Sequence, residues 1–109
     1  NLIGRCVVAG GIRRAAQLAL GDPHDARFLE LKRDARAAQT HRWVANHSVL
    51  ARVGMDYEAV ADLTAASGEP GYLWLENARA FGRMGHPPDH ADEGALGTNP
   101  CADQTLWDR

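Results

Sequence analysis

The sequence predicts an α/β fold in which parallel strands alternate with helices. Segments with apolar residues at every second position alternate along the chain with segments of helical spacing, and turns rich in glycine and proline separate them. Alternation of this kind is typical of a parallel sheet. Parallel strands need cover on both faces, and 109 residues would leave sheet edges open. We therefore expect a partial segment of a larger architecture and not a complete domain.

The amino-terminal third predicts one strand and one helix. Segment 1–8 is apolar and is compatible with either the end of a helix or a strand, and the glycines at 10–11 interrupt it. Alternating apolar residues predict a short strand over 15–20. The Gly-Asp-Pro sequence at 21–23 predicts a turn or a helix start with the aspartate as N-cap, and helical spacing continues to about position 38.

The segment 43–50 predicts the next strand, with two different faces. Alternation places Asn46 and Ser48 on one face, and His47 and Val49 on the other. Two polar residues on one face indicate either a polar site on the substrate side or a hydrogen-bonded structural network. Periodicity leaves both interpretations open.

The second half predicts a further helix, a strand and a long loop. Asp56 can cap a helix to about position 66, with an apolar stripe formed by Tyr57, Val60, Ala61 and Thr64. The glycines and the proline of 67–71 end this helix. An apolar run at 72–75 predicts the third strand, 77–81 has helical spacing, and 85–97 predicts a loop.

Composition and cysteine count exclude several classes of protein. A net charge of −2 gives no electrostatic reason to expect nucleic-acid binding, and no run of about 18 apolar residues is present to span a membrane. Two cysteines without a CxxC pair make neither a disulfide framework nor a zinc ribbon, so we expect reduced thiols in a cytoplasmic protein. His86 and His90 flank two prolines, which predicts a solvated loop and no metal site.

The chemistry of the chain is expected in the sequence Asn99-Pro100-Cys101-Ala102-Asp103-Gln104. Alternation along an extended loop would place the side chains of Asn99, Cys101 and Asp103 on the same side. An amide, a thiol and a carboxylate together suit radical or acid–base chemistry on a polar substrate. The alternative for Cys101 is a buried structural thiol, which is what we expect for Cys6 in its apolar run.

Four segments, in order along the chain, resemble the adenosylcobalamin-dependent ribonucleoside-triphosphate reductases. Residues 4–16 look like the family's glycine–arginine loop, 43–49 like a barrel strand that carries Asn and Ser, 69–79 like the stretch before the finger loop, and 99–106 like the finger loop itself. The resemblance covers essentially all 109 residues. It implies that 1–109 is an internal fragment of the ten-stranded α/β barrel of the catalytic domain, so both ends are expected to be cut points.

The resemblance also implies roles for the residues of the finger loop. Cys101 would become the thiyl radical that abstracts the 3′ hydrogen of a ribonucleotide, and Asn99 would be the family's hydrogen-bonding asparagine. Asp103 stands where the family has a glutamate that handles the 3′-hydroxyl proton. Its side chain is one methylene shorter, and a misplacement of about 1 Å can cost about a hundredfold in rate.

Substrate, effector and cofactor follow from the same resemblance. The glycine–arginine loop would transmit the identity of a deoxynucleotide effector to the substrate base, whereas the alternative for it is a turn with solvated charges. The implied enzyme reduces ribonucleoside triphosphates to 2′-deoxyribonucleotides for DNA synthesis, with adenosylcobalamin as cofactor and a thioredoxin-type reductant. The residues of this loop are Gly10, Gly11, Ile12, Arg13 and Arg14.

The isolated fragment is expected to be inactive, because the two redox cysteines that complete the reaction would lie outside it. One would fall at position 112, beyond Arg109, and the other far upstream. Three alternatives stay open. They are a catalytically degenerate, reductase-like nucleotide-binding protein, at which Asp103 hints, a ribonucleoside-diphosphate reductase, and a small independent α/β binding domain.

Overall fold

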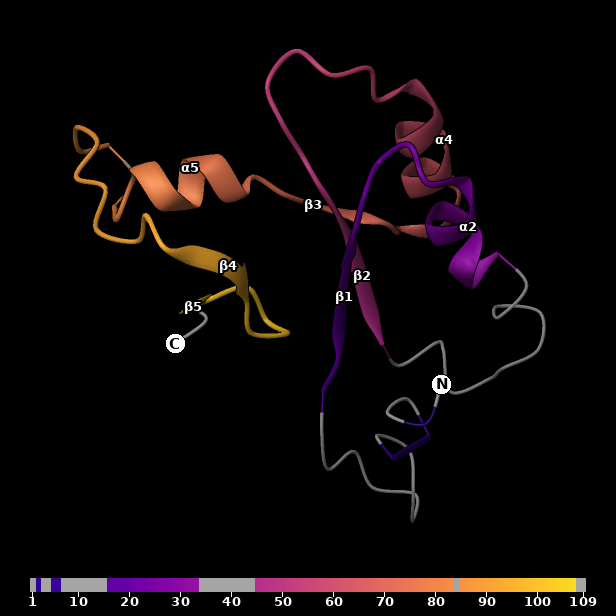
Figure 1. The fold of residues 1–109 in the computed structure, drawn as a ribbon. Helices are drawn as coiled ribbons and strands as arrows, with labels where there is room; N and C mark the ends of the chain where they lie inside the picture. The colour runs from indigo at the N-terminus through magenta and orange to yellow at the C-terminus, as the bar shows by residue number, and fades with distance from the viewer. Residues whose placement is uncertain (1, 3–4, 7–15, 34–44, 84, 108–109) are drawn as a thin grey trace.

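The structure of the chain is a computed structural model that describes residues 2, 5–6, 16–33, 45–83 and 85–107 (Figure 1). The described residues of 16–33, 45–83 and 85–107 form nine elements. In chain order they are β1 (Leu18–Gly21), α2 (Ala26–Leu29), the 3₁₀ turn η2 (Glu30–Lys32), β2 (Asn46–Leu50), α4 (Glu58–Ser67), β3 (Gly71–Leu73), α5 (Leu75–Ala80), β4 (Ala95–Thr98) and β5 (Thr105–Trp107).

The first three strands form one parallel sheet in the order β1-β2-β3. Leu18 pairs with Asn46 across β1 and β2, and Ser48 pairs with Gly71 across β2 and β3. Helices α2 and α4 follow β1 and β2 in the chain and lie next to each other against one face of the sheet (Figure 1). The predicted α/β alternation with parallel strands is confirmed for the segment from β1 to β3.

The core lies between β2 and these helices. Val49 of β2 and Val60 of α4 are 0% and 1% exposed, and His47 shares the buried face of Val49. Asn46 is exposed and Ser48 is half-buried, so the predicted two-faced character of β2 is confirmed. The stripe predicted for α4 is only partly right, because Ala61 faces solvent while Val60 is buried.

Two helices begin at different residues from those predicted. Asp25 caps α2 by accepting hydrogen bonds from the backbone N–H groups of Arg27 and Phe28, whereas Asp22 accepts one from His24 and closes a turn. Helix α4 begins at Glu58, and the carboxylate of Asp56 accepts a hydrogen bond of 3.0 Å from that residue's N–H. A short polar side chain can close a turn or cap a helix equally well, so spacing alone misplaced these starts.

The largest difference from the prediction is an antiparallel hairpin. The segment 85–97 was predicted to be loop throughout, yet its end forms β4, which pairs with β5. Gly97 of β4 is buried against β1, where a Cβ atom at this position would lie 3.1 Å from Leu20 Cδ1. The hairpin therefore packs closely on the sheet through a glycine, which sequence periodicity could not reveal.

Two further expectations concern the surface of the chain. Cys6 was expected to be a core thiol, but it is exposed, because an apolar run does not itself supply a surface to pack against. No helix in the described ranges is long and apolar enough to cross a membrane. The continuation of the first predicted helix beyond residue 33 lies outside the described residues.

Candidate functional site

The candidate site is a cleft between the sheet and the turn of the hairpin. Its volume is about 230 Å³. The sheet contributes Leu18 from β1 and the two polar residues of β2, Asn46 and Ser48, and the hairpin contributes Thr98, Pro100 and Ala102. The structure therefore brings the predicted polar face of β2 to the predicted finger loop, although the two are about fifty residues apart in the sequence.

Asn99 organises the turn that carries the thiol. Its side-chain Oδ1 accepts hydrogen bonds of 3.1 Å from the backbone N–H groups of Asp103 and Gln104, and its Nδ2 donates to Asp103 Oδ1. Its backbone carbonyl accepts from the N–H of Ala102 at 3.0 Å. Ala102 has a φ of +59°, which a non-glycine residue adopts rarely.

The extended loop predicted for 99–104 is therefore wrong. Asn99 and Asp103 do lie together, but the reason is a tight turn that folds back on itself and not alternation along an extended strand. Side chains that satisfy neighbouring backbone groups are a competing outcome for asparagine and aspartate in such loops.

Cys101 lies at the exposed part of this turn and is a free thiol. Its exposure contradicts the alternative of a buried structural thiol. Asp103 lines a neighbouring cleft of about 520 Å³ together with Gln104 and Ala78 of α5, so the exposed thiol and the carboxylate both belong to open surfaces beside the turn. The roles of Cys101, Asn99 and Asp103 in a reaction stay predictions.

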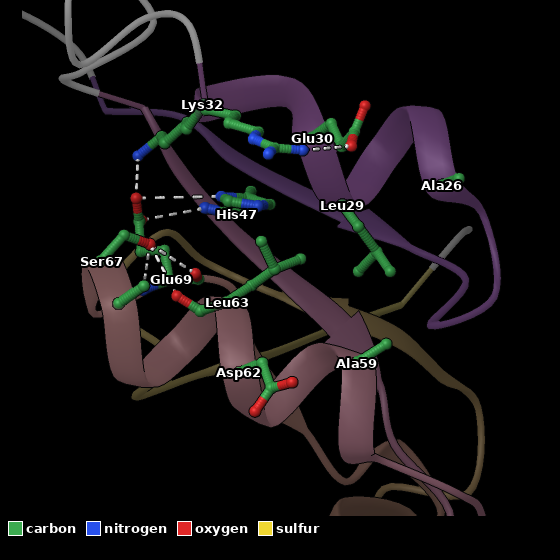
Figure 2. A pocket seen from close by; sticks show the side chains of 12 residues that line it. Ala26, Leu29, Glu30, Lys32, His47, Ala59, Asp62, Leu63, Ser67 and Glu69 are labelled. Atoms are coloured by element: carbon green, nitrogen blue, oxygen red, sulfur yellow. Dashed lines mark hydrogen bonds and ion pairs between the residues drawn. The ribbon is translucent and has the colours of Figure 1, made fainter.

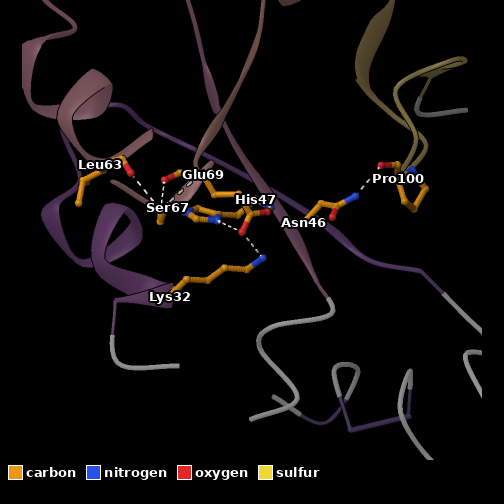
Figure 3. Close-up of polar contacts among 7 residues, drawn as sticks. All are labelled: Lys32, Asn46, His47, Leu63, Ser67, Glu69 and Pro100. Atoms are coloured by element: carbon orange, nitrogen blue, oxygen red, sulfur yellow. Dashed lines mark hydrogen bonds and ion pairs between the residues drawn. The ribbon is translucent and has the colours of Figure 1, made fainter. Parts of the chain in front are cut away.

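Asn46 ties the strand to the turn. Its side-chain Nδ2 donates a hydrogen bond of 3.1 Å to the backbone carbonyl of Pro100, the residue before Cys101 (Figure 3). Ser48 lies two residues further along the same face, where a Cβ atom on Gly71 would lie 2.8 Å from its Oγ. The absence of a side chain on Gly71 thus leaves room for the Ser48 hydroxyl beside the cleft.

One lining residue was missed by the sequence. Thr98 borders both clefts, and its Oγ1 is buried without a hydrogen-bond partner. A buried hydroxyl without a partner is uncommon and marks a place where a bound molecule can donate or accept. In the sequence, only its position directly before Asn99 could have indicated that Thr98 belongs to the site. The residues predicted to form the glycine–arginine loop, 10–14, lie outside the described residues.

The opposite face of β2 carries a second polar cluster, between α2, η2 and α4. His47 and Glu69 line a cavity of about 620 Å³, and Figure 2 shows Lys32 reaching the carboxylate of Glu69. His47 Nδ1 lies 3.8 Å from Glu69 Oε2. Burial lowers the pKa of His47 below its ordinary 6.5, opposed by the negative charge of Glu69 and assisted by the positive charge of Lys32. His47 is therefore neutral at neutral pH.

The loop with the two histidines is organised by an aspartate. Asp89 accepts hydrogen bonds from the N–H groups of Ala91 and Gly82, and these bonds lower the pKa of its carboxyl group. Among the described residues, no three His, Cys, Asp or Glu side chains are grouped so that they could hold a metal ion. Through its two hydrogen bonds Asp89 joins the two ends of this loop, at Gly82 and Ala91.

Comparisons with known proteins agree on one family. The chain is 46% identical to an adenosylcobalamin-dependent ribonucleoside-triphosphate reductase of Euglena gracilis and 44% identical to a probable one of Dictyostelium discoideum, over 97% of its length in both cases. It also resembles a crystal structure of a B-12 dependent (class II) ribonucleotide reductase, with a TM-score of 0.80 and 34% identity over 99% of the chain.

The similarity concerns a small part of each relative. The chain spans 15% of the Euglena protein, 14% of the Dictyostelium protein and 15% of the crystallised chain. No family model matches the chain.

Proposed function

We propose that this chain, which is homologous to a segment of the adenosylcobalamin-dependent class II ribonucleoside-triphosphate reductases, is the segment that presents the radical-bearing cysteine in such an enzyme. In this proposal β1, β2 and β3 are neighbouring strands of the ten-stranded catalytic barrel, and the β4–β5 hairpin is its finger loop. The complete enzyme would reduce ribonucleoside triphosphates to 2′-deoxyribonucleotides.

The observation that carries the proposal is the placement of Cys101. Its thiol is exposed on a turn that is fixed from within by Asn99 and from the sheet by Asn46. A reacting group must be held in a defined position and still be reached by its partner, and this arrangement meets both needs. Thr98 adds a buried hydroxyl without a partner at the same place.

The residues of the turn suit the proposed steps. The Cys101 thiol gives up one hydrogen atom, takes one from the ribose and later returns it. The Asp103 carboxylate can accept the proton of a substrate hydroxyl. The 2′-hydroxyl leaves as water, and two electrons come from a cysteine pair outside this segment, which becomes a disulfide that a thioredoxin-type reductant restores.

The exposed thiol fits the chemistry of the cofactor. Bound adenosylcobalamin supplies the one-electron chemistry that a thiol lacks, and an open position at the tip of the turn lets that chemistry reach the sulfur. The relatives' names support triphosphates as substrates. A deoxynucleotide effector acting through residues 10–14 and a cytoplasmic location belong to the same proposal.

The proposal is tested by replacing the cysteine in the complete reductase that carries this segment. We expect Cys101→Ser to abolish deoxynucleotide formation from a ribonucleoside triphosphate in the presence of adenosylcobalamin and a dithiol. Cys6→Ser, which changes the other exposed thiol, is the matched control and should keep the activity. Product formation by Cys101→Ser at the unmodified rate would rule out the proposed role.

A further inference from the structure

The end of β2 nearest the turn lacks part of its partner strand. Along β2 the backbone N–H groups point alternately to the two neighbours: the N–H of Asn46 donates to Gln17 beside β1, and that of Ala51 donates to Leu73 of β3. By this alternation the N–H of His47 faces β3. However, β3 begins at Gly71, opposite Ser48, so it supplies no strand residue opposite His47.

The side chain of Glu69 takes the missing place. Counting back in steps of two from Leu73 gives Gly71 and then Glu69, whose backbone carbonyl is turned away and accepts a hydrogen bond from Ser67 Oγ at 2.8 Å. Its carboxylate Oε1 instead accepts from the N–H of His47, at 3.4 Å. The carboxylate therefore extends the β2–β3 ladder by one hydrogen bond.

Lys32 fixes this carboxylate from the other side. Its Nζ forms an ion pair with Glu69 Oε2, and the two side chains are only 11% and 26% exposed (Figure 3). An ion pair that is partly shielded from water holds its geometry better than an exposed one. Glu69 thus joins η2 to β2 at the residue next to Asn46.

We infer that Glu69, held by Lys32, is a positioning residue for the turn that presents Cys101. The contacts run from Lys32 through Glu69 to the His47 backbone, and from the adjacent Asn46 to the Pro100 carbonyl. Loss of the carboxylate frees the end of β2 and lets the turn shift. The inference rests on the proposed function for its kinetic consequence, but not for its structural one.

The experiment compares two Glu69 variants in the complete reductase. Glu69→Ala removes both the ion pair and the hydrogen bond, and we expect it to lower kcat by about 10- to 100-fold with a smaller change in KM, since a misplacement of about 1 Å costs up to about a hundredfold. Glu69→Gln keeps an acceptor for the His47 N–H, and we expect it to stay within about fivefold of the unmodified enzyme. Lys32→Met removes the ion pair but keeps the carboxylate, so we expect a loss between those of Glu69→Gln and Glu69→Ala.

A second readout does not need activity. The rate at which iodoacetamide alkylates Cys101, followed by mass spectrometry, should change in Glu69→Ala and be restored in Glu69→Gln. The control is Glu76→Ala, which breaks the exposed ion pair of 3.5 Å with Arg52. It should alter neither kcat nor the alkylation rate of Cys101.

The outcomes separate the two proposals. Unchanged kcat and unchanged Cys101 alkylation in Glu69→Ala would overturn the positioning inference, as would equal losses in Glu69→Ala and Glu69→Gln. If Glu69→Ala does not fold, Lys32→Met decides the matter, and unchanged kcat together with unchanged Cys101 alkylation in that variant overturns the inference. An unmodified protein that forms no deoxynucleotide would reject the proposed function, while the alkylation rates would still test the inference.

Discussion

At the scale of single residues, the side chain of Asn99 has two roles in the turn 99–104. Asn99 satisfies the backbone of the turn, and the same side chain donates to the carboxylate of Asp103. Such a bond orients the carboxylate. The proposed base is therefore held in place by the residue that shapes the turn.

The first prediction concerns Asp103. Asp103→Asn keeps Oδ1 as the acceptor for Asn99 but removes the charge, so the turn should persist while proton transfer is lost. We expect kcat of the complete reductase to fall by about 10²- to 10⁴-fold with little change in KM. Asp62→Asn, on the exposed face of α4, is the control and should have no effect.

The same position decides between an active and a degenerate site. An active unmodified enzyme supports Asp103 as the working carboxylate. If the unmodified enzyme is inactive and Asp103→Glu forms deoxynucleotides, the shorter side chain has disabled the site and the degenerate alternative is correct.

At the scale of elements, the β4–β5 hairpin depends on one unfavourable backbone position. Ala102 adopts a left-handed conformation because the turn has to return the chain to Thr105 and because its N–H donates to the Asn99 carbonyl. A Cβ atom in this conformation costs about 1–2 kcal/mol, most of which glycine avoids.

We therefore expect Ala102→Gly to stabilise the hairpin by up to about 1 kcal/mol, after subtraction of the extra freedom of glycine in the unfolded chain. Hydrogen exchange of the segment 95–107 in the complete protein measures this as slower exchange. Ala65→Gly, in the exposed part of α4, should speed exchange of its own helix, because glycine is unfavourable there. Faster exchange of the hairpin in Ala102→Gly would contradict the strain argument.

At the scale of the whole molecule, β2 borders two polar environments, and His47 and Glu69 line the cavities of both. The face of β2 with Asn46 and Ser48 borders the thiol-bearing turn, and the face with His47 borders the helices. His47 is 4% exposed and neither ring nitrogen has a hydrogen-bond partner. Protonation of this imidazole is therefore unfavourable in the folded state.

This burial predicts a pH dependence of stability. Because the pKa of His47 is lower in the folded state than its ordinary 6.5, the unfolded chain binds the proton first as the pH falls. The contribution to stability is thus present above about pH 6.5 and lost as the pH falls below it. Glu69 and Lys32, the charged groups beside the ring, act in opposite directions on this pKa.

The measurement is the thermal unfolding midpoint of the complete protein and of His47→Gln between about pH 7.5 and about pH 5.5. The midpoint should fall more steeply in the unmodified protein, since the variant has no group to protonate at this position. Equal slopes in the two proteins would show that His47 does not titrate in this range.

The sequence by itself determined the order of strands and helices as far as α5, the two faces of β2 and the resemblance to the reductases, because these depend on local spacing and on residue types in order. Only the tertiary structure decided how the site is assembled. The bond from Asn46 to Pro100 joins residues 54 positions apart, and that from His47 to Glu69 joins residues 22 apart. Neither has a local signal, because packing of one element on another selects the partner.

The finger-loop sequence illustrates the same division. Its residue types indicated the chemistry, whereas the position of Gly97 against Leu20 and the left-handed Ala102 produced a hairpin and not an extended loop. Backbone hydrogen bonds between β4 and β5 outweigh local alternation, since pairing satisfies the polar groups of both strands at once.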